Sequence, residues 1–340
     1  MTSKSLEMGP SKKGPFRMTF PKIKLSTKGI DLSGKVAIVT GSNTGLGFHC
    51  AHHLLSLKLA HLIIAVRSVE KGEIAAASLR KEFPSARVDV WKLEMTSYES
   101  IQEFVRRIDT ELPRLDITIL NAGLAHLNFT PCESTGHCDV IQVNYLSTFL
   151  LAILIIQALK KKSPTGSPAR LTIVNSGTSL TAKLPNRDKR PLLKSFDDPA
   201  IQPFEGMERY SSSKLLGHLF LVRLLKYLNP DEVIVNLIEP GLIKGTGLMQ
   251  EAKGVMGAVF AVASLLVARS TSDGAWFFID AAVVKGKESH GCYIEDDKIH
   301  PFADLVYQPE GGPIMDALWE ETMAEFEFVG VREMLQGWIE

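Results

Sequence analysis

Short apolar runs alternate with longer helical patterns along most of this chain. Six runs rich in Val, Ile and Leu predict buried strands, because strands covered on both faces are apolar throughout. They occupy residues 35–40, 62–66, 88–93, 116–120, 170–174 and 233–238. Helical patterns lie between them, at residues 71–83, 97–110 and 139–162 and around Tyr210. This alternation predicts an α/β fold, a doubly wound parallel sheet with helices on both faces and ligands at the carboxyl ends of its strands.

The length of the chain fits one large domain. Its 340 residues would form a single α/β domain over residues 29–340, after an extension at 1–28. The expected parts of this domain are a cofactor half, two substrate-pocket segments and a C-terminal tail, at about residues 30–180, 180–207, 242–285 and 286–340. The extension carries seven Lys and Arg residues against one acid, Glu7. It is either a solvated extension or an arm for targeting or membrane contact.

Composition and charge narrow the class of protein. Hydrophobic residues make up 45% of the chain and the formal net charge is +0. We therefore expect a globular protein with a large core and no electrostatic attraction to nucleic acid. The four cysteines lack the paired spacing of zinc or redox sites, and no signal-peptide pattern precedes them. Cys132 and Cys138 fit isolated reduced thiols better than metal ligands, so the sequence predicts no metal site and a cytoplasmic location.

Two apolar runs require a comparison with membrane spans. Residues 145–159 and 255–268 are each shorter than the ~20 residues that a span requires. Both runs predict buried core helices, and no span is expected. For the second run, peripheral contact with a membrane surface stays open.

A glycine-rich turn follows the first predicted strand directly. Gly41, Gly45 and Gly47 are separated by three residues and then by one, and a helical pattern starts at Phe48. In dinucleotide sites this layout brings the backbone close to the pyrophosphate, at a helix N-terminus. The spacing departs from the G-x-G-x-x-G fingerprint, but the strand, turn and helix together predict a dinucleotide cofactor.

The second predicted strand ends in a cation. An NAD site usually has an acid about 20 residues beyond the glycine turn, whereas an Arg suits the 2′-phosphate of NADP. Arg67 lies 20 positions after Gly47 (67 − 47), and no acid occupies that strand end. Lys71 adds positive charge one helical turn later. The sequence therefore predicts NADP(H), with an ordinary loop cation as the alternative reading of Arg67.

A tyrosine and a lysine stand four residues apart at the start of a later helix. On a helix, Tyr210 and Lys214 share one face, with Cβ atoms roughly 5–6 Å apart. A phenol normally has a pKa of about 10. A neighbouring ammonium lowers that value, toward the range useful for acid–base chemistry near neutral pH. We therefore expect Lys214 to lower the pKa of Tyr210.

Taken together, these motifs resemble the short-chain dehydrogenase/reductase family. They occur in the order of that family, as TGSNTGLG at 40–47, Asn121-Ala122-Gly123, Asn144, Ser176, Tyr210-x3-Lys214 and Pro240-Gly241. The match covers about residues 30–300 and looks like the retinol-dehydrogenase-like branch. The tail, with SHGCY at 289–293 and a helical stretch at 319–328, resembles reductases of filamentous-fungal secondary metabolism. The resemblance implies a Rossmann-type fold in a single domain with a C-terminal extension.

The resemblance also implies a role for each catalytic residue. Tyr210 would give a proton to a carbonyl oxygen, or take one from an alcohol, while the nicotinamide exchanges hydride. Lys214 would lower the pKa of Tyr210 and hold the nicotinamide ribose. Ser176 would hydrogen-bond the substrate oxygen, and Asn144 would anchor a water that links Lys214 to solvent.

Two of these assignments have alternatives. Ser179 or Thr178 could supply the working hydroxyl in place of Ser176. Asn144 could be a buried structural amide.

The resemblance assigns further residues to the parts of the cofactor. They are Gly41, Asn43, Gly45, Leu46 and Gly47 at the phosphates, Arg67 with Lys71 at the 2′-phosphate, Leu93 and Glu94 at the adenine, Asn121, Ala122 and Gly123 at its ribose, Pro240, Gly241 and Ile243 at the carboxamide, and Thr246 at the phosphates. Glu94 departs from the family, which usually has Asp there. Lys244 and Gly245 lengthen the segment before Thr246.

A long segment rich in Pro and charge separates Ser176 from Tyr210. Long loops inside domains are usually functional or disordered, so we expect residues 184–204 to border the substrate pocket. Residues 249–278 are rich in small and apolar side chains and should form the other wall. Such walls suit an apolar substrate, although plain core packing explains each single residue equally well.

These inferences predict an NADP(H)-dependent oxidoreductase that acts on CH–OH groups or reduces a ketone of an apolar small molecule, in secondary-metabolite biosynthesis. One alternative is a retinoid- or sterol-type alcohol dehydrogenase, and another is a catalytically silent NADP-binding regulator. The chain would be a monomer or a homodimer. The apolar helices that carry Asn144 and Tyr210 either pack across a dimer or are covered by the C-terminal tail.

Overall fold

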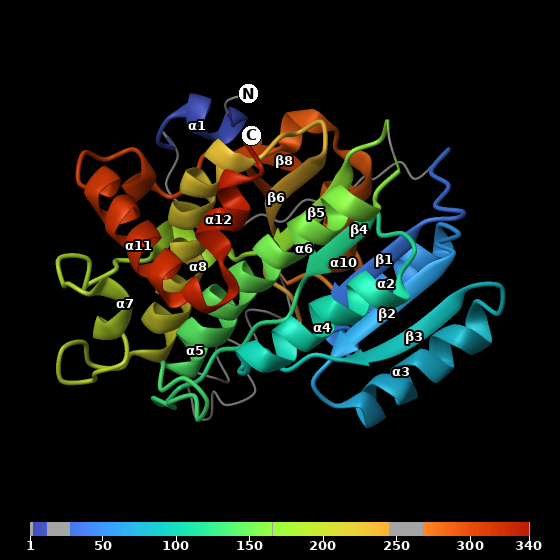
Figure 1. The fold of residues 1–340 in the computed structure, drawn as a ribbon, viewed down its shortest axis with the longest axis horizontal. Helices are drawn as coiled ribbons and strands as arrows, with labels where there is room; N and C mark the ends of the chain where they lie inside the picture. Colours follow the sequence, from blue (N-terminus) through green and yellow to red (C-terminus); the bar gives the residue numbers. More distant parts are fainter. Residues whose placement is uncertain (1–2, 12–27, 165, 245–267, 340) are drawn as a thin grey trace.

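An eight-stranded sheet runs through the centre of the molecule in the computed structural model of the chain (Figure 1). The structure describes residues 3–11, 28–164, 166–244 and 268–339. The strand order is β3-β2-β1-β4-β5-β6-β7-β8. The strands are β1 (Val36–Thr40), β2 (His61–Val66), β3 (Arg87–Lys92), β4 (Ile117–Leu120), β5 (Ala169–Val174), β6 (Val233–Glu239), β7 (Cys292–Glu295) and β8 (Lys298–His300).

The strands from β1 to β6 confirm the predicted alternation. Each predicted apolar run forms a strand, and neighbouring strands pair in parallel. β1 pairs with both β2 and β4, so the chain crosses to the other side of β1 after β3. Doubly wound sheets bind ligands beside such a reversal, at the carboxyl ends of the strands.

The C-terminal tail extends the sheet, which the sequence did not predict. β7 pairs in parallel with β6, and β8 pairs with β7 in the antiparallel sense. Asp296 and Asp297 make the turn between them, both with positive φ. Strands of four and three residues are too short to show a clear hydrophobic period. Only the edge strand β8 departs from the parallel arrangement.

Helices cover both faces of the sheet, as predicted. One apolar cluster joins the sheet to α2, α3 and α10, and a second joins it to α4, α6 and α8. α11 and α12 belong to the second cluster and form an outer layer over its other helices (Figure 1). Their bounds are α2 (Gly45–Ser56), α3 (Val69–Glu82), α4 (Tyr98–Glu111), α6 (Thr148–Lys162), α8 (Gly206–Leu224), α10 (Thr271–Ile279), α11 (Gly311–Glu325) and α12 (Val331–Gln336).

A long apolar helical stretch lies inside the molecule. It consists of α5 (Asp139–Ile141), a π-helical turn (Gln142–Ser147) and α6. These 24 residues are long and apolar enough to cross a membrane by length and composition, but their apolar window is 100% buried within the fold. The stretch is therefore a core helix, as predicted. The second apolar run, at 255–268, falls almost wholly outside the described residues.

The C-terminal helices cover the apolar side of α6 and α8. The hydroxyl groups of Tyr145 and Thr322 lie 2.6 Å apart, which joins the core helix to α11. Beyond α12, the Trp338 indole N–H donates to Gln157 Oε1 at 2.6 Å. The tail therefore covers the helices that carry Asn144 and Tyr210, which is one of the two arrangements that the sequence left open.

The N-terminal helix α1 (Lys4–Met8) packs on the strands of the tail. Ser5 Oγ donates to the His300 carbonyl at 2.5 Å and accepts from the Tyr293 N–H at 3.0 Å. The basic composition of this region gave no sign of the contact. Most of its basic residues belong to residues 12–27, outside the described part of the chain.

Candidate active site

The glycine turn after β1 lets α2 begin close to the sheet. Gly41 and Gly45 have φ values of 64° and 59°, which residues with a Cβ rarely adopt. A Cβ on Gly47 would lie 2.5 Å from the Gly41 carbonyl oxygen. Because these close approaches are available, α2 begins at Gly45, earlier than the predicted Phe48.

The start of α2 fits the pyrophosphate of a dinucleotide. Thr44, its N-cap residue, makes no side-chain cap hydrogen bond, and the first turn holds no acid. Its first backbone N–H groups, at the positive end of the helix dipole, are therefore suited to an anion. Asn43 lies partly buried in the turn. The side chains of Leu46 and Ile243 meet beside Gly274, within 2.9 Å of a Cβ built there.

Asn121 has a role that the resemblance did not imply. Its Nδ2 donates to the carbonyl oxygens of Thr40 and Gly41, at 2.9 and 3.2 Å. The backbone N–H groups of Asn121 and Ala122 both donate to Thr40 Oγ1 at 2.9 Å. The Asn121 side chain thus braces the glycine turn from the end of β4. Ala122 and Gly123 are left for the predicted ribose contact.

Arg67 and Glu94 follow the neighbouring strands β2 and β3. The Arg67 side chain is 79% exposed, and its Nε lies 3.9 Å from Glu94 Oε2. Glu94 Oε1 accepts from the N–H and the hydroxyl of Thr96, at 3.1 and 2.9 Å. Lys71 is exposed in the first turn of α3, and Leu93 is buried. An exposed guanidinium at this strand end suits a 2′-phosphate.

Tyr210 and Lys214 lie in the first half of α8, on one face, as predicted. Lys214 Nζ is 5.8 Å from the centroid of the Tyr210 ring and donates to the Val174 carbonyl at 3.0 Å. Lys214 is 7% exposed, and burial lowers its pKa to about 8. A Cβ on Gly123 would lie 3.5 Å from Nζ. The ammonium group therefore lies between α8 and the ends of β4 and β5.

Burial dominates the pKa of the Tyr210 phenol. It raises the pKa of Tyr210 to about 12, while a hydrogen bond with Ser176 opposes the rise and Glu239 adds to it. The net shift is therefore upward, and the lowering expected from Lys214 stays a prediction. The Lys214 ammonium lies over the ring of Tyr210, and burial disfavours the positive charge of the lysine. Near neutral pH the phenol keeps its proton and can act as a donor.

Ser176 follows β5 and reaches the phenol of Tyr210. Its Oγ accepts from the N–H and the hydroxyl of Thr178, at 3.3 and 3.1 Å. Ser179 Oγ is buried and donates to the Ser176 carbonyl at 2.7 Å. The geometry therefore favours Ser176 over Ser179 as the hydroxyl beside the reacting oxygen, with Thr178 as its support.

Asn144 lies in the π-helical turn of the core helix. Its Oδ1 accepts from the Leu124 N–H at 2.9 Å, and its Nδ2 donates to the Leu124 carbonyl and to Ser213 Oγ, at 2.8 and 3.0 Å. The amide thus ties the segment after β4 to α8, as a structural amide would. Oδ1 also lies 3.1 Å from a Cβ built on Gly123, close to Lys214. The water-anchoring role stays a prediction.

Comparison with known proteins decides the family. The short chain dehydrogenase family profile matches residues 35–182. The short chain dehydrogenase/reductase mfmJ of Annulohypoxylon moriforme is 53% identical over 306 residues, which cover 90% of this chain and 88% of that protein. The chain belongs to the short-chain dehydrogenase/reductase family. The short-chain dehydrogenase fogG of Aspergillus ruber is 42% identical over 92% of this chain and 90% of its own length.

Solved structures confirm the Rossmann-type fold. An NADPH-bound short chain oxidoreductase from Pseudomonas aeruginosa PAO1 is similar with a TM-score of 0.58 and 20% identity, over 78% of this chain and 95% of that chain. The RhlG/NADP complex of Pseudomonas aeruginosa has a TM-score of 0.60 and 21% identity, over 82% and 98%. At such identities the similarity concerns the fold alone.

The short-chain dehydrogenase/reductase site continues in the segment after β6. Arg269 Nη1 donates to the Pro240 carbonyl at 3.0 Å, and the buried guanidinium also pairs with Asp296. Ile243 forms a parallel bridge with Arg269. These contacts hold the predicted carboxamide segment against the end of the sheet. Thr246, the last predicted cofactor contact, lies outside the described residues.

The predicted pocket segment between Ser176 and Tyr210 is held in place by α11. It contains the short helix α7 (Leu192–Ser195). The N–H groups of Leu192 and Leu193 each donate to the Glu321 carboxylate at 2.7 Å. The C-terminal extension therefore fixes the segment that is predicted to border the substrate pocket, and the pocket itself stays a prediction. Most of the other predicted wall, at 249–278, lies outside the described residues.

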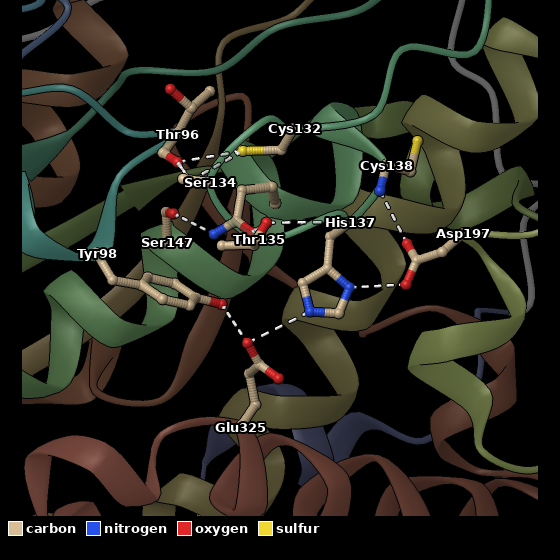
Figure 2. A network of polar contacts seen from close by, with 11 residues as sticks. Thr96, Tyr98, Cys132, Ser134, Thr135, His137, Cys138, Ser147, Asp197 and Glu325 are labelled. Carbon is tan, nitrogen blue, oxygen red and sulfur yellow. Dashed lines mark hydrogen bonds and ion pairs between the residues drawn. The ribbon is translucent and has the colours of Figure 1, made fainter.

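A histidine joins the pocket segment to two other parts of the chain (Figure 2). His137 Nδ1 lies 2.7 Å from Asp197, and its Nε2 lies 3.3 Å from Glu325. Tyr98 donates to Glu325 at 2.9 Å, and the Cys138 N–H donates to Asp197 at 2.8 Å. Burial opposes a charge on His137, but hydrogen bonds with the two carboxylates outweigh it and raise the pKa to about 10. The imidazolium is therefore charged at neutral pH.

Sequence reasoning missed three residues of this site. Arg269 and His137 depend on partners far along the chain, which no local pattern reveals. Glu239 did carry a signal, because an acid at the end of a mostly apolar, buried strand is unusual. It precedes Pro240, so its position beside the cofactor segment could have been recognised.

Proposed function

We propose that this protein is an NADPH-dependent reductase that converts a ketone of an apolar small molecule into an alcohol, in fungal secondary metabolism. The observation that carries the proposal is the cluster of Ser176, Tyr210 and Lys214 at the strand ends, in one site with the exposed Arg67. The fungal sources of the relatives support the setting. We further propose a cytoplasmic location.

In the proposed reaction, each residue has a role that its surroundings allow. The cofactor would supply the hydride. Ser176 would hydrogen-bond the carbonyl oxygen, and Tyr210 would donate its proton to that oxygen as the alcohol forms. A positioned acid of this kind contributes roughly 10²–10⁴-fold. The raised pKa of Tyr210 supports the direction of reduction, because the protonated phenol is the form that it requires.

The residues around the glycine turn fit NADPH. The N-terminus of α2 would hold the pyrophosphate, since its N–H groups have no side-chain cap. Arg67 would pair with the 2′-phosphate, and Lys71 would add charge from the first turn of α3. Lys214 would hold the nicotinamide ribose.

Apolar side chains beside the start of α8 support an apolar substrate. The rings of Phe129 and Phe204 make an edge-to-face contact, with centroids 6.1 Å apart. A Cβ on Gly206 would lie 3.1 Å from the Leu127 Cα, so the segment after β4 touches the pocket segment. Leu127 and Met207 are large apolar residues with exposures of 52% and 49%. An apolar molecule would cover such surface with a gain of roughly 25 cal/mol per Å².

A panel of aliphatic and aromatic ketones, incubated with the purified protein and NADPH or NADH, tests the proposal. We expect oxidation of NADPH with at least one apolar ketone and much slower oxidation of NADH. Tight NADPH binding without turnover on a broad panel would support a silent regulator instead. Turnover only of retinoid or sterol alcohols with NADP⁺ would support the oxidative dehydrogenase.

A further inference from the structure

A buried carboxyl group that the proposed mechanism does not use lies beside the catalytic serine. Glu239 is the last residue of β6 and is 9% exposed. Side chains alternate along a strand, so Glu239 points to the same face as Leu237, which packs in the cluster with α8. A Cβ on Gly177, the residue after Ser176, would lie 3.3 Å from Glu239 Oε1. The carboxyl group therefore faces the segment of Ser176 and the helix of Tyr210.

Charged and titratable groups approach Glu239 from several elements. They are Tyr293 and Glu295 on β7, Asp296 in the turn after it, Arg269 before α10 and Tyr210 on α8. Burial, with smaller contributions from Glu295 and Asp296, raises the pKa of Glu239 to about 8 against the opposing effects of a backbone N–H and Arg269. Arg269 already pairs with Asp296. Glu239 therefore gains its charge only in mildly alkaline solution.

We propose that Glu239 is a positioning residue that acts through Tyr210: its carboxylate disfavours the phenolate and so keeps the proton that carbonyl reduction needs on Tyr210 in alkaline solution. This inference rests on the proposed function for its consequence in catalysis. The electrostatic effect of Glu239 on Tyr210 does not depend on it.

The sign of the effect follows from elementary electrostatics. A negative charge near a phenol makes loss of the phenolic proton harder, because the product would be a second anion. Glu239 becomes charged near pH 8, below the range in which Tyr210 ionises. Glu239 is thus already a carboxylate at the pH at which Tyr210 would begin to lose its proton. Glu239 leaves the overall equilibrium unchanged, since no residue can alter it, but widens the pH range over which reduction proceeds.

The test is the replacement Glu239→Gln, which removes the charge and keeps the shape. We expect the alkaline limb of the pH profile of kcat/KM for ketone reduction to move to lower pH by about one unit or more, because at an effective dielectric constant of ~20 one charge shifts a pKa by about one unit even from roughly 12 Å away. KM measured well below the limb should stay within a factor of about two, since the substrate contacts are retained. Glu239→Asp should restore part of the wild-type limb.

A direct titration separates this inference from the proposed function. The tyrosine ring carbons can be labelled, and the NMR signal of Tyr210 identified by its loss in Tyr210→Phe. Glu239→Gln should lower the pH at which that signal titrates, whether or not any ketone is reduced. Glu295→Gln, which removes a charge one strand further away, is the matched control and should produce a smaller shift.

Either of two results would overturn the inference. One is a Tyr210 titration unchanged by Glu239→Gln. The other is an equal shift in Glu295→Gln, which would show a general effect of net charge. If Glu239→Gln does not fold, the comparison between Glu239→Asp and the wild-type protein decides, because a shorter acid moves the charge away from Tyr210 and must still lower its titration point.

Discussion

At the scale of single residues, two cations of the site occupy opposite surroundings. Arg67 stands in solvent at the end of β2, where its 79% exposed side chain can move onto an anion. Lys214 is 7% exposed and held by the Val174 carbonyl, and burial lowers its pKa. The exposed Arg67 suits selection between cofactors, because it gives up few contacts within the protein when it binds an anion. The buried Lys214 suits precise placement of a ribose.

Replacing Arg67 by Ala should reduce the preference for NADPH. A charge-assisted hydrogen-bonded contact contributes about 1.5–3 kcal/mol, so KM for NADPH should rise roughly 10–100-fold while KM for NADH changes little. Steady-state kinetics with both cofactors measures this. Lys71→Ala is the matched control and should have a smaller effect. Equal use of both cofactors by the wild-type protein, unaffected by Arg67→Ala, would remove the assignment.

At the scale of elements, the C-terminal helix α11 contacts two segments near the candidate active site and holds them in place. α11 caps α7 through Glu321 and holds His137 through Glu325 (Figure 2). His137 also pairs with Asp197 in the pocket segment. Three stretches that are far apart in sequence therefore meet at one charged imidazole. Because the two ring nitrogens of His137 face one carboxylate each, the ring must carry both protons to donate to both.

The stability contributed by His137 should depend on pH. Its folded pKa of about 10 lies above the unfolded value of about 6.5, so the contribution is complete below pH ~6.5 and is lost as the pH rises through ~10. Between pH ~7 and pH ~9.5 the free energy of unfolding should fall by about 3 kcal/mol more in the wild-type protein than in His137→Gln. Urea unfolding at both pH values measures the difference. Parallel loss in both proteins would contradict this account.

The elements also show where sequence reasoning ends. β1 to β6 and their helices could be predicted, because each is long enough to carry its own hydrophobic period. β7 and β8 could not, since their few residues become strands only by pairing with β6. In the site, the glycine turn and the Tyr210–Lys214 spacing are local and were recognisable. The raised pKa of Tyr210 was not, because it comes from burial, which depends on the whole fold.

At the scale of the whole molecule, the C-terminal helices cover the apolar side of the core helices α6 and α8. α11 and α12 lie over α6 and α8, and Trp319 of α11 stacks on Phe220 of α8 with ring centroids 5.0 Å apart. In solution we therefore propose a monomer, because this face is already buried. Sedimentation equilibrium of the full chain should give the monomer mass.

Removing these outer helices should strongly destabilise the fold. Ending the chain after Glu310 deletes buried groups such as Leu318, Trp319 and Met323. Each large apolar side chain contributes roughly 1.5–3 kcal/mol, so the sum approaches the 5–15 kcal/mol that stabilises a typical domain. We expect aggregation or loss of a cooperative thermal transition. Ending the chain after Gly330, which removes α12 and the residues beyond it but keeps α11, is the control and should destabilise the protein less. An unchanged Tm in the shorter chain would contradict the assigned role.

We propose above all that Tyr210 donates the proton in an NADPH-dependent reduction. Tyr210→Phe keeps the ring and removes only the hydroxyl group, so cofactor binding should be retained. Single-turnover oxidation of bound NADPH, with a ketone that the wild-type protein reduces, measures the step directly. We predict a rate at least about 100-fold lower in Tyr210→Phe, with an unchanged Kd for NADPH. Full wild-type turnover by Tyr210→Phe would contradict the account.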